Sequence, residues 1–220
     1  MSLSQQAYGI IKRKIISLEY APNDVLNENE LREALELGRT PIREALQQLE
    51  RDNLVKVLPR KGILVSDIDL GALSQIHEVR RPLELISVEL ATKRGTKEIW
   101  DEMQACLSRI SAESSPTLTD NDLLAIDEQC HILTHQAADN PFIKDTLEVL
   151  YTHALRLWYY SLPKIKDLRS AVLEHQAMLD AMKVGDAKTA CNLMESHINA
   201  FHNEISSAIQ NKLNLGNPPS

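Results

Sequence analysis

Hydrophobic residues near the N-terminus recur every three or four positions, which predicts amphipathic helices. The first expected helix carries its apolar positions at Tyr8, Ile11, Ile15 and Leu18. A second helix is expected after Asn27, a good N-cap that is followed three residues later by Glu30. The chain is therefore expected to begin with two helices that each have one apolar face to bury.

A third helix is expected to begin at Thr40-Pro41, because a hydroxyl can cap a helix and proline suits its first position. Its apolar residues share one face: Ile42, Ala45, Leu46 and Leu49. Its other positions face outward: Arg39, Thr40, Arg43 and Gln47. Such a helix suits the DNA major groove. By itself, helix-turn-helix spacing fits an ordinary helical hairpin with a solvated polar face equally well.

The pattern changes to strict alternation directly after this helix. Val55, Val57, Ile63 and Val65 alternate with polar or turn residues and predict two short strands. The strands are joined through the basic turn Pro59-Arg60-Lys61-Gly62, which can contact phosphates or the minor groove. A helix-turn-helix followed by such a turn predicts a winged helix that binds double-stranded DNA.

The residues Arg39-Thr40-Pro41-Ile42-Arg43-Glu44-Ala45-Leu46, with Leu49-Glu50, Leu54-Val55 and the Gly62 turn, resemble the DNA-binding domain of GntR-family bacterial transcriptional regulators. The resemblance covers residues 4 to about 66. It implies that DNA is contacted by Arg39, Thr40, Arg43 and the wing around Lys61-Gly62, to which the pattern adds Gln47 and Arg60. The sequence departs from the family at Glu36, which usually is a turn glycine, and at Gly38, which usually is a small hydroxyl residue.

The remainder of the chain shows helical periodicity only. Six helices are expected at about residues 69–93, 97–113, 119–138, 141–160, 165–184 and 186–211. They are separated by breakers at Gly95-Thr96, Ser114-Ser115-Pro116, Asn140-Pro141, Pro163 and Gly185. The fold class is therefore mainly α, with a winged helix at 1–66, an antiparallel helical bundle at 69–211 and a flexible tail at 212–220.

Three helices of the expected bundle each carry a ligand-type side chain on a largely apolar face. Asp127 and His131 are four residues apart and share a helix face, whereas His175 and His197 lie on later helices. A divalent cation would satisfy all four groups, with Zn²⁺ as the first candidate and Ni²⁺ or Mn²⁺ as alternatives. The alternative is that these are separate core or surface residues that share no ligand. His135 is the nearest rival to Asp127, because it also lies four residues from His131.

Residues 69 to 211 resemble the FCD effector domain of the FadR subgroup of GntR regulators. The matching pieces are Val79-Arg80 with Glu84, Asp127-x3-His131, Asn140-Pro141, Glu174-His175 and Met194-x2-His197. The resemblance implies a metal held by Asp127, His131, His175 and His197, and a small carboxylate effector. We expect Arg80 to bind that carboxylate, although a salt bridge to Glu84 on the same helix is an equal alternative.

Charge and cysteine content refine the picture without changing it. Residues 1–66 carry a net charge of +1 and the remainder −8, so the acidity of the chain lies outside the expected DNA-binding region. The three cysteines show no paired motif and indicate reduced thiols. No apolar run is long enough to span a membrane and no signal-peptide pattern is present, so we expect a cytoplasmic protein with no membrane partner.

These observations predict a ligand-responsive transcriptional regulator rather than an enzyme. We expect a repressor that binds an inverted-repeat operator as a homodimer and responds to a small carboxylate at the metal. Two alternatives remain from the sequence: a metal-dependent enzyme acting on a small organic acid, and a regulator for which the metal ion itself is the signal.

Overall fold

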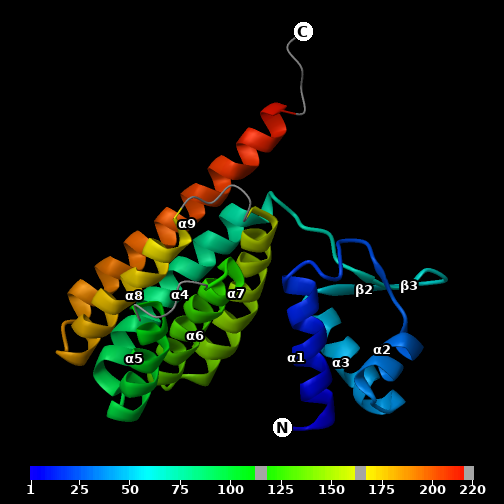
Figure 1. Ribbon diagram of the computed structural model, residues 1–220, viewed down its shortest axis with the longest axis horizontal. Helices are drawn as coiled ribbons and strands as arrows, with labels where there is room; N and C mark the ends of the chain where they lie inside the picture. Colours follow the sequence, from blue (N-terminus) through cyan, green and yellow to red (C-terminus); the bar gives the residue numbers. More distant parts are fainter. Residues whose placement is uncertain (112–117, 162–166, 216–220) are drawn as a thin grey trace. The chain divides into compact units, whose positions relative to one another are not determined.

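The N-terminal hydrophobic pattern is realised as three helices and three short strands. The elements are α1 (Leu3–Ile16), β1 (Val25–Leu26), α2 (Glu28–Leu35), α3 (Arg39–Arg51), β2 (Val55–Leu58) and β3 (Gly62–Val65). They are seen here in a computed structural model, which describes residues 1–111, 118–161 and 167–215 (Figure 1). Contacts divide the chain into two units, residues 1–70 with Thr152–Tyr160, and Gly71–Tyr151 with Ser161–Ser220. Each unit is described by itself.

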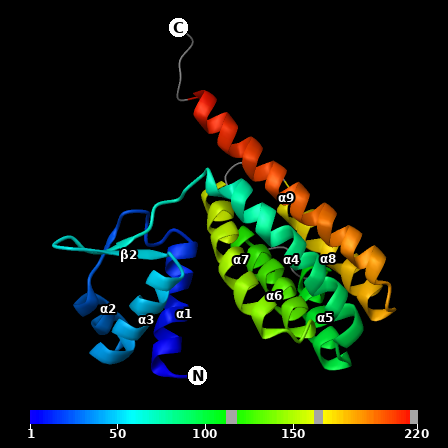
Figure 2. The same ribbon diagram turned by 180° about the vertical axis from the view of Figure 1, so that it is seen from behind.

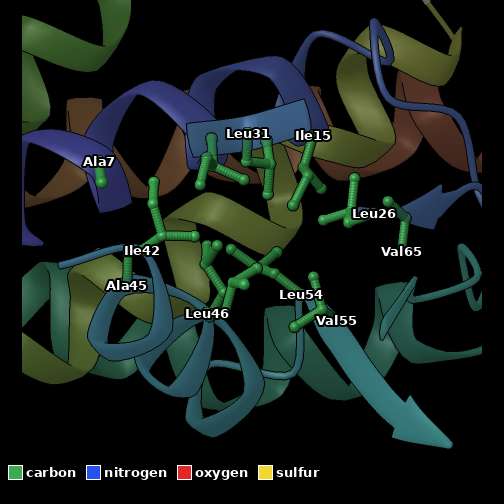
Figure 3. Close-up of a cluster of buried hydrophobic side chains, with 12 residues drawn as sticks. Ala7, Ile15, Leu26, Leu31, Ile42, Ala45, Leu46, Leu54, Val55 and Val65 are labelled. Atoms are coloured by element: carbon green, nitrogen blue, oxygen red, sulfur yellow. The ribbon is translucent and has the colours of Figure 1, made fainter. Parts of the chain in front are cut away.

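The apolar faces of the first three helices form one core with the sheet (Figure 3). It contains Ala7, Ile11, Ile15, Leu26, Leu31, Ile42, Ala45, Leu46, Leu49, Leu54, Val55 and Val65. Each buried Leu or Ile contributes about 1.5–3 kcal/mol relative to exposure. This core holds the polar face of α3 outward, as the helical spacing predicted. Leu18, expected on the first helix, lies beyond its end and has a positive φ of 62°.

The ends of α2 and α3 differ in part from the predicted caps. Asn27 caps α2 as expected, but its side chain accepts from Asn29 N at 2.9 Å and its amide donates to Glu30 Oε1 at 3.2 Å. The prediction that Thr40 caps α3 was wrong, because the helix begins at Arg39 after Gly38, which makes no side-chain cap bond. Thr40 and Pro41 lie in the first turn, where a missing N–H leaves no helix hydrogen bond unmade.

The two predicted strands pair as a hairpin, with Val55 opposite Val65 and Leu58 opposite Gly62. The backbone N–H of Lys61 donates to Leu58 O at 3.1 Å and closes the turn. Gly62 has a φ of +89°, a conformation in which a side chain would be strained. The sheet order is β1-β3-β2, and the two-residue β1 was not predicted from the sequence.

The six helices predicted after the winged helix all form within the residues that the structure describes. They are α4 (Ala72–Arg94), α5 (Lys97–Ser111), α6 (Asp120–Ala137), α7 (Pro141–Ser161), α8 (Leu168–Lys183) and α9 (Ala187–Leu215). The last part of α7, Thr152–Tyr160, is grouped with the first unit. The reverse view shows α4, α5, α6, α8 and α9 side by side as a bundle (Figure 2).

Several predicted boundaries in the bundle need correction. Helix α4 begins after Gly71, which makes no side-chain cap bond, rather than at about residue 69 as expected. Residues 212–215, placed in a flexible tail by the sequence, are the helical end of α9. The expected breaks at Ser114-Ser115-Pro116 and Pro163, and the rest of the tail, lie outside the described residues. Among the described helices, none is both long and apolar enough to cross a membrane.

Helix packing brings the elements with candidate ligands into contact. Helix α6 packs against α4, α5 and α8, and α8 packs against α9. The turn after α4 depends on Gly95, where an added Cβ would lie 2.0 Å from the Trp100 ring. A side chain at this position would displace the ring of Trp100, which lies in the first turn of α5 and is 8% exposed. Close approach at this corner therefore fixes the turn from α4 into α5, which then packs against α6 and α8.

Candidate functional site

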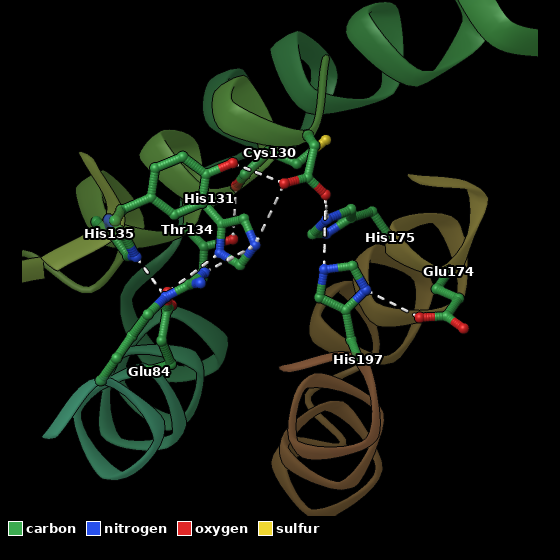
Figure 4. A network of polar contacts seen from close by, with 11 residues as sticks. Glu84, Cys130, His131, Thr134, His135, Glu174, His175 and His197 are labelled. Carbon is green, nitrogen blue, oxygen red and sulfur yellow. Dashed lines mark hydrogen bonds and ion pairs between the residues drawn. The ribbon is translucent and has the colours of Figure 1, made fainter. Parts of the chain in front are cut away.

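The four candidate metal ligands converge inside the bundle (Figure 4). Asp127 and His131 come from successive turns of α6, His175 from α8 and His197 from α9. All four side chains are buried, with at most 5% of each residue exposed. Their potential ligand atoms all lie within 4.8 Å of one another. The structure thus brings together residues that the sequence places up to 70 positions apart.

The carboxylate of Asp127 is at the centre of this cluster. Its Oδ1 lies 2.9 Å from His175 Nε2 and 3.5 Å from His197 Nε2, and its Oδ2 lies 3.9 Å from His131 Nε2. Tyr151 on α7 donates its hydroxyl to Oδ2 at 2.6 Å. The same nitrogen of each imidazole therefore faces one carboxylate.

A second polar cluster adjoins the first through the His131 ring. Its Nδ1 lies 3.3 Å from Glu84 Oε1 on α4, so the two nitrogens of His131 face different carboxylates. His135 Nε2 lies 2.9 Å from Glu84 Oε2. Glu84, His131 and His135 form a second group with metal-ligand geometry. From the sequence, His135 was only a rival of Asp127 as the partner of His131, and Glu84 was only the possible salt-bridge partner of Arg80.

Arg80 joins both clusters. Its Nε donates to Glu84 Oε1 at 3.0 Å, so the salt bridge anticipated as an alternative is present. Its Nη2 also lies 3.4 Å from His131 Nε2, and its guanidinium lies over the Tyr151 ring at 4.7 Å. Arg80 is 3% exposed. The salt bridge therefore holds the guanidinium beside the candidate ligands.

The electrostatic environment favours an ionised carboxylate at the centre. Burial opposes ionisation of Asp127, but hydrogen bonds from His175 and His197 hold its pKa well below the usual range. Burial lowers the pKa of His131 to about 4 and also lowers that of His175. Burial acts the same way on His197, but hydrogen bonds with Asp127 and with Glu174 raise its pKa to about 9.

The donor set fits a divalent cation. One carboxylate and three imidazoles are the N and O ligands that Zn²⁺, Ni²⁺ and Mn²⁺ accept. His197 Nδ1 lies 2.9 Å from Glu174 Oε2, which leaves Nε2 turned toward Asp127. A carboxylate on the far nitrogen is the common support of a metal-binding histidine. Glu174 and Glu84 would supply that support, and only the position of Glu174 next to His175 hinted at it in the sequence.

In the first unit, the residues predicted to contact DNA are all exposed. Arg39, Thr40, Arg43 and Gln47 lie on α3, Arg60 and Lys61 lie in the hairpin turn, and Gly62 begins β3. Arg43 Nε lies 3.0 Å from Glu28 Oε2 at the start of α2, and its side chain is 62% exposed. This exposed pair contributes at most about 1 kcal/mol to stability, so the guanidinium can exchange Glu28 for another acceptor.

Comparison with known families explains both units. Residues 3–65 match the model of the bacterial regulatory proteins of the gntR family, and residues 75–200 match the FCD domain. The chain belongs to the GntR family. It is a DNA-binding transcriptional regulator with an FCD effector domain, as the resemblance at both motifs predicted.

Relatives of this GntR regulator match over most of their length. The transcriptional repressor RspR of Escherichia coli is 25% identical over 205 residues, covering 92% of this chain and 89% of RspR. The repressor GlaR of the same species is 28% identical over 204 residues, covering 89% and 92%. The E. coli McbR/YncC structure has a TM-score of 0.81 at 22% identity, covering 96% and 99%. These proteins are regulators, so the alternative of a metal-dependent enzyme is set aside.

Proposed function

We propose that this GntR regulator is a repressor whose operator binding responds to a small carboxylate bound in the FCD domain. The observation that carries the proposal is the convergence of Asp127, His131, His175 and His197 with the Arg80 guanidinium beside them. The repressor assignment draws on RspR and GlaR, which are named as repressors. As a DNA-binding regulator, the protein would act in the cytoplasm.

Asp127, His131, His175 and His197 would hold the divalent cation, with zinc as the first candidate. Once bound, the cation would supply a positive centre with open positions for an oxygen ligand. Arg80 would contribute a second positive group, because its Nη2 is directed at the edge of the His131 ring. A guanidinium and a cation side by side favour a small carboxylate over a neutral ligand. Glu84 would keep Arg80 in place, since the two are already joined at 3.0 Å.

The regulator would recognise its operator through α3 and the hairpin turn. Arg39, Thr40, Arg43 and Gln47 would reach the major groove, while Arg60, Lys61 and the Gly62 backbone would contact phosphates or the minor groove. Two copies related by a two-fold axis would match an inverted repeat. Effector binding would change how the two winged helices of the dimer match the two half-sites.

Gel-shift assays with DNA from upstream of the regulator's own gene test this function. We expect a specific shift that is reduced by one member of a series of acetate, lactate, malate and citrate, and only when the metal is present. A shift that chelation alone abolishes, with no carboxylate response, would instead show that the ion is the signal. Absence of any specific shift would contradict the regulatory assignment of this operator region, and unchanged binding with every acid would contradict a response to acids of this series.

An exposed apolar stripe on α4 is the surface we propose for the homodimer. Val79 and Ile86 are 49% and 45% exposed, and Leu83 and Leu90 lie partly exposed at matching helical positions. GntR regulators commonly dimerise, and a stripe of this spacing can pack against its two-fold copy. An acidic residue in the stripe would leave a charge buried between two apolar faces.

The change Ile86→Glu is therefore expected to produce monomers and to weaken operator binding by roughly tenfold or more. Light scattering after size-exclusion chromatography measures the mass, and gel shift measures the affinity. Ser74→Glu adds the same charge at an exposed position on another face of α4 and should leave the dimer intact. A dimer of unchanged stability in Ile86→Glu would show that the copies meet elsewhere.

A further inference from the structure

The root of the β2–β3 hairpin is bound by residues that lie about 90 positions later in the sequence. The root consists of residues 52–54, which lead from α3 into β2, and of Ser66 and Asp67, which follow β3. Ser66 N donates to Leu54 O at 2.9 Å and joins the two sides. The segment Thr152–Tyr160 of α7 belongs to the same unit as the hairpin, and its side chains contact both sides of the root.

Arg156 binds the side of the root that follows β3. Its Nη2 donates to Ser66 O at 2.5 Å, and its Nη1 donates to Asp67 O at 3.4 Å. Arg156 is 3% exposed, and burial lowers its pKa to about 10, which leaves the guanidinium charged at neutral pH. Hydrogen bonds from a charged donor in the interior are stronger than those between neutral groups in water, so this side of the root is firmly held.

His153 binds the other side of the root, at the end of α3. Its Nε2 lies 2.9 Å from Asp52 O. Because a carbonyl oxygen only accepts, this nitrogen carries the ring proton and donates it. Asp52 is the C-cap of α3, and its carboxylate accepts from the Tyr8 hydroxyl on α1 at 2.7 Å. The residue that leads from α3 toward β2 is thus bound by two helices.

We propose that His153 and Arg156 are positioning residues, which hold the root of the hairpin so that its tip reaches the DNA. The tip is the basic turn that carries Arg60 and Lys61. The inference rests on the proposed contact between this turn and DNA. Both positioning residues lie beyond residues 3–65, which match the gntR model, so DNA binding would depend on a later part of the chain as well.

The shape of the hairpin makes its tip sensitive to its root. Val55 is buried and the next three residues of β2 are exposed, while β3 begins exposed at Gly62 and ends buried at Val65. The core therefore holds both strands at the root. Strands of four residues place the tip about 13 Å from the root, at about 3.3 Å per residue. A rotation of about 10° at the root would move the tip by about 2 Å, enough to break a hydrogen bond.

The salt dependence of DNA binding tests the proposal on the full-length regulator. Arg156→Met keeps an apolar side chain in the interior and removes both donors to the root. The probes are the duplex from upstream of the regulator's own gene and a random duplex of equal length, which reports phosphate contacts even without specific binding. Each phosphate contact contributes about 0.9 to the slope of log affinity against log salt concentration. We expect Arg156→Met to reduce this slope by about 2–4, because Arg60 and Lys61 would lose their contacts in both copies of a dimer.

A double-mutant cycle distinguishes placement from stability. Partial unfolding lowers the fraction of protein that can bind, but it leaves the slope of the folded remainder unchanged. The tip variant, Arg60→Ala with Lys61→Ala, should reduce the slope as much as Arg156→Met does. Adding Arg156→Met to the tip variant should reduce the slope no further, because a misplaced tip then has no charge to lose.

The tip variant also separates failure of this inference from failure of the proposed DNA contact. An unchanged slope in Arg156→Met, beside a reduced slope in the tip variant, would overturn the inference and leave the contact of the turn with DNA standing. An unchanged slope in the tip variant would overturn both. Full additivity of the two changes would show that Arg156 acts on other contacts, which also contradicts the inference.

Arg94→Met is the matched control. Arg94 Nη1 likewise donates to two backbone carbonyls, Ala138 O at 2.8 Å and Asp139 O at 3.2 Å, but all three residues belong to the second unit. The variant makes the same change of charge and should keep the wild-type slope. A reduction equal to that of Arg156→Met would assign the effect to the general loss of such bonds and overturn the inference.

His153 tests the other side of the root, and it keeps the proposal testable if Arg156→Met fails to fold, because His153 is only partly buried. His153→Phe retains a ring and removes the N–H donor, so the slope should fall. His153→Gln retains an N–H donor and should keep most of the wild-type slope. Equal slopes for these two variants would refute a positioning role for the hydrogen bond to Asp52.

Discussion

Replacing His197 with alanine is expected to remove the divalent cation from the purified regulator and to lower its thermal unfolding midpoint. His197 is 4% exposed, its Nε2 faces Asp127, and its Nδ1 is held by Glu174. Loss of one of four ligands should weaken metal affinity by at least about 100-fold, because even the loss of a supporting residue costs about 10- to 100-fold. A cation bound about 100 to 1,000 times above its Kd stabilises the fold by about 2.7–4.1 kcal/mol.

Chelation separates the metal from the side chain in this experiment. A chelator should lower the unfolding midpoint of the wild type and leave that of His197→Ala unchanged, with metal content measured by mass spectrometry. His77→Ala is the matched control, because His77 is a partly buried histidine outside the cluster. Full metal occupancy in His197→Ala would mean that the ligand set is wrong.

Replacing Arg43 with alanine is expected to abolish specific operator binding while leaving the regulator folded. The Arg43 side chain is 62% exposed and pairs with Glu28 at the surface, so its loss removes little packing. A bidentate arginine contact with a base contributes about 1–3 kcal/mol to discrimination, and a dimer on an inverted repeat would lose this contact in both half-sites. Gel shift or fluorescence anisotropy at fixed salt, on operator and random DNA, measures both affinity and specificity.

Arg51→Ala is the control for this prediction. Arg51 is an exposed arginine in the last turn of the same helix, so the variant makes the same charge change away from the predicted contact surface. We expect its operator affinity to stay within a few-fold of the wild type. Equal affinities for Arg43→Ala and the wild type would contradict the recognition role of α3.

The winged helix was readable from the sequence because its signals are local. Apolar spacing along α3 and alternation along β2 and β3 follow directly from periodicity, and all three elements formed. The errors arose where two neighbouring residues could both cap a helix, or where a strand was too short to show a pattern. Gly38 adopts the extended conformation of an N-cap without a side chain, so the helix starts one residue before Thr40. β1 has two residues, too few for any alternation to show.

The candidate site was readable only in part, for a different reason. Helical spacing shows that Asp127 and His131 share a face, but it does not show which faces of other helices meet them. The contributions of Glu84, His135 and Tyr151 depend on how α4 and α7 approach α6. Family resemblance supplied the long-range information for the four candidate ligands alone.

The turn between α2 and α3 contains Glu36 in a left-handed conformation, with φ 54° and ψ 37°. This is the position where glycine is usual in the family. A non-glycine residue there costs about 1–2 kcal/mol, so Glu36 is under local strain.

The buried Arg80–Glu84 pair limits how the effector site can be dissected. Glu84 is fully buried and its carboxylate is balanced by Arg80 together with His131 and His135. Truncating Arg80 alone would leave an uncompensated negative group in the interior, at a cost of about 3–5 kcal/mol, and misfolding would then resemble loss of ligand response. A paired neutral replacement, Arg80→Met with Glu84→Gln, removes the guanidinium without creating a lone interior anion. Because Glu84 also faces His131, the ligand response of this double variant reports on the arginine only when its metal content matches that of the wild type.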